Sequence, residues 1–94
     1  MTGLAAGATS KPRLPRGVRL KYDATRGEWH LLAPERVIRA DAIAVEILKR
    51  CDGSSTLAQI VDDLAAQFSA DRARVEQDVR MMLSELAAKR MVDL

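Results

Sequence analysis

The chain has 94 residues, one cysteine, one histidine and a formal net charge of +2, and 48% of its residues are hydrophobic. This composition is typical of a small soluble protein, and the single cysteine excludes an internal disulfide and a multi-cysteine metal site. No stretch approaches the run of about 20 apolar residues that is needed to span a bilayer. We therefore expect a cytoplasmic protein with at most one domain, which is too small to enclose a deep active site.

Residues 1–15 are rich in glycine, alanine, threonine and serine, and two prolines lie near the end of this segment. The segment shows no apolar periodicity, which is typical of a flexible tail or linker. We therefore expect the folded domain to span residues 16–94.

Three short stretches have the pattern of β-strands. Residues 18–23 alternate apolar and polar side chains, residues 28–33 carry apolar groups on both faces, and residues 36–40 form a third, shorter stretch. Gly27 and Pro34 mark the turns between them. The short connections predict a three-stranded antiparallel meander, with residues 28–33 as the central strand.

The third strand runs straight into a helix. Asp41 has the side chain and the position of an N-cap, and apolar residues follow at helical spacing as far as Cys51. Asp52-Gly53 is expected to stop this helix, because glycine adopts the left-handed conformation at little cost.

Two further helices follow. Thr56 and Gln59 fit a capping box at the start of the second helix, and residues 57–68 carry an apolar stripe. Ser69-Ala70-Asp71 is expected to break and recap the chain, and the third helix to run to about Arg90, with residues 91–94 frayed or loosely packed. The chain is therefore predicted to be an α+β domain, in which a three-stranded antiparallel sheet is followed by a three-helix bundle, as in a winged helix-turn-helix.

No catalytic residue, metal site or cofactor is predicted. His30 has no second ligand or nucleophile at usable spacing, and Cys51 on an apolar helix face behaves as a small hydrophobe. Asp62 and Asp63 are adjacent on a helix and therefore point in different directions.

The stretch from Arg36 to Gly53 indicates a binding function instead. A helix that directly follows the third strand would hold that strand at the edge of the small sheet. One side of the strand would then be free to pair with another chain. The sequence therefore favours a module that binds a peptide over one that catalyses a reaction.

Two other functions stay open, a winged-helix nucleic-acid-binding protein and a structural subunit that only dimerises. Cations outnumber acids as far as Arg26, and the third helix carries Arg72, Arg74 and Arg80. The second helix, however, has no cation, and acidic residues lie among the arginines of the third. Because DNA binding needs cations that face phosphates, nucleic acid is the less favoured partner.

A group of short motifs extends from Pro12 to Leu94: Arg13-Leu14, Val18-Arg19-Leu20, Arg26, Leu31-Leu32, Pro34-Glu35, Ala44, Ile47-Leu48, Cys51-Asp52-Gly53, Ile60, Leu64, Asp78-Val79, Leu83 and Leu86. In these motifs the chain resembles the PqqD family of pyrroloquinoline quinone (PQQ) biosynthesis, and more broadly the recognition domains of ribosomally made, modified peptides. Asp41-Ala42 departs from the family, which commonly has asparagine and a small polar residue there. Aspartate and asparagine both cap helices, so we expect the same fold.

The resemblance implies a peptide chaperone without a cofactor and without a membrane partner. Such proteins bind the precursor peptide PqqA and present it to PqqE, a radical S-adenosylmethionine enzyme that cross-links a glutamate and a tyrosine of the peptide. In related domains the leader adds as a strand to the third strand and contacts the third helix. The peptide-binding residues expected from this are Val37, Ile38, Arg39, Val75, Asp78, Met81, Met82 and Glu85. Whether Val37 or Ile38 faces the groove is left open.

Overall fold

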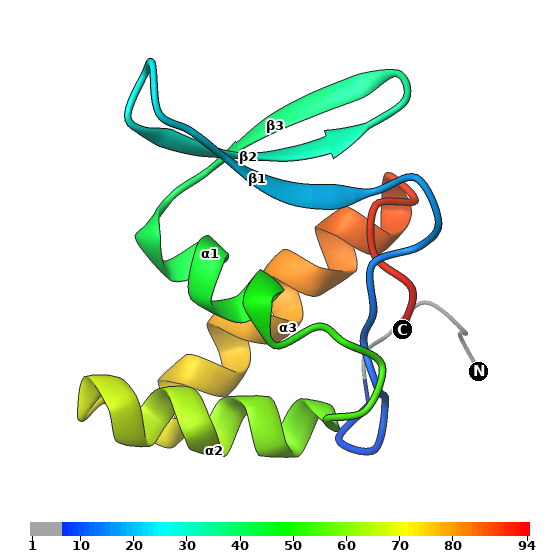
Figure 1. The fold of residues 1–94 in the computed structure, drawn as a ribbon. Coiled ribbons are helices and arrows are strands. Elements are labelled where there is room, and N and C mark those ends of the chain that lie inside the picture. The colour runs from blue at the N-terminus through cyan, green and yellow to red at the C-terminus, as the bar shows by residue number, and fades with distance from the viewer. Residues whose placement is uncertain (1–6) are drawn as a thin grey trace.

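A computed structural model describes residues 7–94, in which a small sheet packs on three helices (Figure 1). The elements are β1 (Arg19–Asp23), β2 (Glu28–Ala33), β3 (Arg36–Ala40), α1 (Ala42–Lys49), α2 (Leu57–Phe68) and α3 (Arg72–Ala88). The strands are antiparallel and lie in the order β1-β2-β3. The predicted α+β class and the meander with a central β2 are confirmed. None of these helices is both long and apolar enough to cross a membrane.

The N-terminus of α1 is as predicted, but its C-terminus is not. The Asp41 carboxylate accepts a hydrogen bond of 2.8 Å from the Ala44 amide, which confirms the N-cap. The helix ends at Lys49 with Arg50 as C-cap, so the expectation that Asp52-Gly53 stops it is wrong. The Arg50 guanidinium donates to the Glu46 carbonyl at 2.8 Å and so satisfies a free acceptor of the last turn.

Asp52 and Gly53 instead form the turn that follows α1. The Asp52 carboxylate accepts from the amides of Ser54, at 2.9 Å, and Ser55. These bonds, the one from the Ser54 amide above all, hold the pKa of the Asp52 carboxyl below its usual value. Gly53 has φ of +81°, and its amide donates to the Pro12 carbonyl.

The predicted capping box at the start of α2 is confirmed. The Gln59 amide donates to the Thr56 hydroxyl at 3.1 Å, and the Thr56 amide donates to the Gln59 side chain at 2.8 Å. Two groups that the helix leaves without partners are thereby satisfied.

The C-terminal residues differ from the prediction. Helix α3 ends at Ala88 because Arg90 is left-handed, with φ of +61°, and the Met91 amide donates to the Leu86 carbonyl at 2.8 Å. The expectation that residues 91–94 are frayed is wrong, since Met91 and Val92 are almost fully buried. The reversal after Arg90 turns both side chains back into the core.

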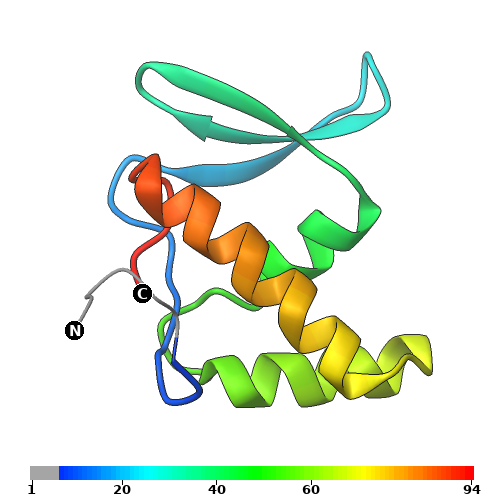
Figure 2. The same ribbon diagram turned by 180° about the vertical axis from the view of Figure 1, so that it is seen from behind.

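Part of the expected tail is also packed into the domain. Arg13 and Asp93 exchange two backbone hydrogen bonds of 2.9 and 2.8 Å, and the Ser10 carbonyl accepts from the Leu57 amide at 2.7 Å. Pro12 is fully buried. Figure 2 shows this segment beside the C-terminus of the chain. The ordered domain therefore begins before residue 16, while residues 1–6 of the expected tail lie outside the described residues.

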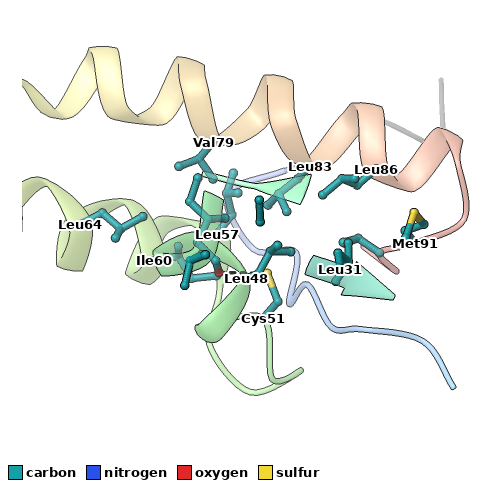
Figure 3. Packing of buried hydrophobic residues seen from close by; sticks show 14 of the residues in the cluster. Leu31, Leu48, Cys51, Leu57, Ile60, Leu64, Val79, Leu83, Leu86 and Met91 are labelled. Carbon is teal, nitrogen blue, oxygen red and sulfur yellow. Dashed lines mark hydrogen bonds between the residues drawn. The ribbon is translucent and has the colours of Figure 1, made fainter. Parts of the chain in front are cut away.

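The core is aliphatic and lies between the inner face of the sheet and the helices (Figure 3). Its buried members are Leu31, Ala40, Val45, Ile47, Leu48, Cys51, Leu57, Ile60, Val61, Leu64, Val79, Leu83, Leu86, Met91 and Val92. Because every element except β1 contributes a buried side chain, the core fixes where β3 lies relative to α3.

We predict that the segment before β1 contributes to stability. A variant that lacks residues 1–13 loses the bonds of Arg13, Ser10 and Pro12, and its free energy of unfolding should fall by about 3 kcal/mol or more, at about 1 kcal/mol for each bond. Urea unfolding followed by circular dichroism measures this change. A variant that lacks only residues 1–6 keeps these bonds and is the control. Equal stability of both deletions would show that residues 7–13 contribute nothing.

Candidate functional site

Strand β3 lies at an edge of the sheet and pairs only with β2 among residues 7–94. Pro34 and Glu35 connect the two strands, so Ala33 and Arg36 form the hydrogen-bonded pair that closes the hairpin. Hydrogen-bonded and non-hydrogen-bonded pairs alternate along an antiparallel ladder. Val37 and Arg39 therefore direct their backbone N–H and C=O groups away from β2, toward the free edge.

The register also settles which residue of β3 faces the helices. Ile38 lies opposite Leu31, which has no exposed surface, so its side chain points toward the helices. Val37 lies opposite Leu32 on the other face of the sheet, and 63% of its surface is exposed. Ile38 thus offers a side chain to the space beside the helices, whereas Val37 offers backbone groups to the free edge.

A cleft of about 370 Å³ lies where β3, α1 and α3 meet, and its lining is mainly apolar. Residues from β2, β3, α1, α3 and the segments next to them line it: Leu31, Ile38, Arg39, Ala40, Asp41, Ile43, Ala44, Ile47, Leu48, Asp78, Met82, Glu85, Leu86 and Lys89. Figure 2 shows α3 passing beneath the sheet at this place. The free backbone groups of β3 therefore lie beside an apolar cleft.

The cleft brings together five of the eight residues predicted to bind peptide, namely Ile38, Arg39, Asp78, Met82 and Glu85. Val37, Val75 and Met81 do not line it. Val75 packs against the core, and Met81 lies on the flank of α3 with 54% of its surface exposed. A single step along a helix turns the side chain by about 100°, which places Met82 in the cleft and Met81 outside it.

Four residues of α1 that line the cleft were missed by the sequence-based prediction, namely Ile43, Ala44, Ile47 and Leu48. Ile43 and Ala44 line the cleft, and 61% of the surface of Ile43 is exposed. Val45, Ile47 and Leu48 are the buried residues of this helix, whereas Ile43 and Ala44 lie in its first turn. Their position just after β3 was the available signal, because the first turn of α1 lies beside the end of the strand that it follows.

Two of the three arginines of α3, Arg72 and Arg80, are engaged with carboxylates. Glu76 accepts from Arg72 at 3.0 Å and from Arg80 at 2.9 Å, and the bond from Arg80 is the main cause of its lowered pKa. Arg72 also pairs with Asp62 of α2. A helix that reads DNA needs cations that are free to reach phosphates. This pairing therefore disfavours the nucleic-acid alternative.

The two residues with potential reactivity lie away from the cleft. Cys51 is buried, its thiol donates to the Ile47 carbonyl, and burial raises its pKa to about 12, with a smaller effect of Asp52. His30 Nε2 lies 2.7 Å from the Glu28 carboxylate, which lowers the pKa of Glu28. Within residues 7–94 no three potential metal ligands come together.

Comparison with known proteins relates the chain to one family. Residues 28–92 match the family model of PqqD, coenzyme PQQ synthesis protein D. A PqqA binding protein of Rhodopseudomonas palustris is 52% identical over 86 residues, which cover 92% of this chain and 84% of that protein. A PqqA binding protein of Xanthomonas oryzae is 49% identical over 85 residues, which cover 90% of this chain and 92% of that protein.

Two solved structures have the same fold. The NMR structure of the PqqD part of Methylobacterium extorquens PqqCD, a functional and stand-alone recognition element for ribosomally synthesised and post-translationally modified peptides, superposes with a TM-score of 0.84. It is 44% identical, and the match covers both chains completely. The crystal structure of PqqD from Xanthomonas campestris is 45% identical, with a TM-score of 0.61 and coverage of 94% of this chain and 98% of that one.

We predict that Cys51 is inert toward thiol reagents in the folded protein. With a pKa of about 12 the thiol stays protonated at pH 8, and only the thiolate is an efficient nucleophile. Ellman's reagent at pH 8 should therefore react slowly with the native protein and completely in guanidinium chloride. An Ala66→Cys variant, which adds a thiol at an exposed position of α2, should react with one equivalent at once. Fast reaction of the unaltered native protein would contradict the buried position of Cys51.

Proposed function

The chain belongs to the PqqD family, and from this premise we propose that it binds the precursor peptide PqqA in PQQ biosynthesis. The names of its relatives, PqqA binding proteins, and the recognition element of Methylobacterium extorquens support this proposal. The observation that carries it is the free edge of β3 beside the apolar cleft.

The peptide binds as an added strand of the sheet. Val37 and Arg39 each offer one N–H and one C=O group, so the edge provides four hydrogen bonds for an extended chain. Side chains of the added strand alternate between its two faces. Every second one therefore enters the cleft next to Ile38, Met82 and Ile43.

The apolar cleft determines which peptide binds. Four backbone hydrogen bonds contribute about 4 kcal/mol, at about 1 kcal/mol each, and any extended peptide can form them. Ordering a disordered peptide costs about 2–5 kcal/mol or more, so the hydrogen bonds alone are nearly offset. Burial of apolar side chains, at about 25 cal/mol per Å², supplies the rest of the affinity and depends on the peptide sequence.

The bound peptide also remains accessible to an enzyme. The side chains that alternate with those in the cleft face away from it, and the peptide beyond the edge of β3 makes no contact with this cleft. A peptide held in this way can be presented to a modifying enzyme. The family resemblance implies that this enzyme is PqqE.

We predict that proline at position 37 separates binding from folding. Val37→Pro removes a donor that points to the free edge, so peptide affinity should fall roughly threefold to tenfold while helical circular dichroism is retained. Ile38→Pro removes a donor that points to Leu31 and should lower the thermal unfolding temperature. Isothermal titration with PqqA measures the affinity, and Val37→Ala controls for the lost side chain. Unchanged affinity of Val37→Pro would argue against strand addition at β3.

We predict that Ile43 contacts the peptide and that Met81 does not. Ile43→Asp should weaken PqqA binding by about 1–2 kcal/mol, or roughly fivefold to thirtyfold, because it places a charge in the apolar cleft. Aspartate in the first turn of a helix is well tolerated, so the fold should persist. Met81→Asp is the matched variant, since Met81 is similarly exposed but lies outside the cleft. An effect of Met81→Asp as large as that of Ile43→Asp would show that the site extends over the flank of α3, as the sequence suggested.

A further inference from the structure

Two acidic side chains of α3 line the cleft without an opposite charge. Asp78 and Glu85 lie about two turns apart, and both are exposed. Among the ion pairs within residues 7–94, neither carboxylate has a partner, although Glu76 of the same helix binds Arg72 and Arg80. Even Lys89, four residues after Glu85, does not pair with it. On α3, the carboxylate of Glu76 is therefore paired with arginines, whereas the two carboxylates that line the cleft form no ion pair with the residues that the structure describes.

A cationic hollow continues the cleft at its other end. It lies between the β2–β3 turn and the end of α3, and its charged lining consists of Arg16, Glu35, Arg36, Lys89 and Arg90. Lys89 lines both the cleft and this hollow. None of these five side chains forms an ion pair with any other residue that the structure describes. Four cations thus face one acid at this end of the site.

The topology places the hollow in line with the free edge of β3. Arg36 is the first residue of β3 and lies on the same face as Ile38, because side chains two residues apart share a face. Figure 1 shows the β2–β3 turn above the C-terminal end of α3, so β3 and α3 run in opposite directions. A peptide along β3 would therefore pass from Asp41 and Asp78 at one end to Arg36 and Lys89 at the other.

We propose that the hollow lined by Arg16, Arg36, Lys89 and Arg90 is a second part of the peptide site, which binds carboxylates of the guest peptide. This inference rests on the proposed function. An edge strand accepts a new strand in either direction, so backbone pairing does not determine the direction of the peptide. The charges do: carboxylates of the peptide lie at the start of β3, and Asp41 and Asp78 at the other end of the cleft disfavour the reversed arrangement.

Charge reversal in the hollow tests this proposal. Arg36→Glu/Lys89→Glu changes the net charge by −4, and Lys11→Glu/Lys21→Glu makes the same change at exposed positions that do not line the cleft or the hollow. Titrations of PqqA at low ionic strength should show at least about a fivefold loss of affinity for the first variant and less than about a twofold loss for the second. Circular dichroism and thermal unfolding show whether each variant is folded.

A second peptide separates the possible causes of a loss. In this peptide every aspartate and glutamate of PqqA is replaced by asparagine or glutamine. It should bind the unaltered protein and Arg36→Glu/Lys89→Glu with equal affinity. Loss with this neutral peptide, or equal loss for both double variants, would overturn the proposal. If the unaltered protein does not bind PqqA at all, the proposed function fails and the inference with it. If PqqA binds equally to all variants, only the inference fails.

The direction of the peptide can be observed independently. A nitroxide label at the more acidic end of PqqA should broaden the amide NMR signals of Arg36 and Lys89 more than those of Asp41 and Asp78. The reverse pattern would overturn the proposal even if the charge variants lose affinity.

Discussion

The functional interpretation depends on the unpaired backbone of β3. Peptide N–H and C=O groups form strong hydrogen bonds, and at a sheet edge only water or another chain can satisfy them. Ile38 and Ala40 anchor the strand from beneath, through contact with the core, while Val37 and Arg39 leave its outer groups free. Helix α1 begins two residues after β3 and places Ile43 beside this edge. The fold therefore places the unpaired backbone groups of β3 next to the apolar cleft.

The segments at the two ends of the chain stabilise the opposite side of that cleft. The backbone bonds between Arg13 and Asp93 join the N-terminal segment to the residues after α3. Met91 and Val92 fold back into the core just beyond the helix. Since α3 provides Met82 and Glu85 to the cleft, contacts far from β3 help to hold this wall of the cleft in place.

Local signals in the sequence predicted most of the fold. Asp41 and Thr56 are caps because short polar side chains satisfy free amides at helix starts, and the alternation in β1 and β2 follows from a period of two. The errors involve contacts that are distant in sequence. Arg13 forms backbone hydrogen bonds with Asp93, which is far away in the sequence. Whether Ile43 is buried or exposed depends on how α1 packs against β3. For the same reason Met81 and Met82 were both predicted to bind the peptide, although the packing of α3 places only Met82 in the cleft.

The arginines of β3 give the open edge a further property. An exposed edge strand invites pairing with the same strand of another copy, which leads to aggregation. If two copies paired antiparallel about Ile38, Arg39 of one copy would lie opposite Val37 of the other and diagonal to its Arg39 on the same face, so these like charges would disfavour the pairing. The like charges of Arg39 therefore disfavour this self-pairing, whereas a chain of different charge meets no such repulsion. The residues of β3 thus combine an open backbone edge with side chains that oppose pairing between identical copies.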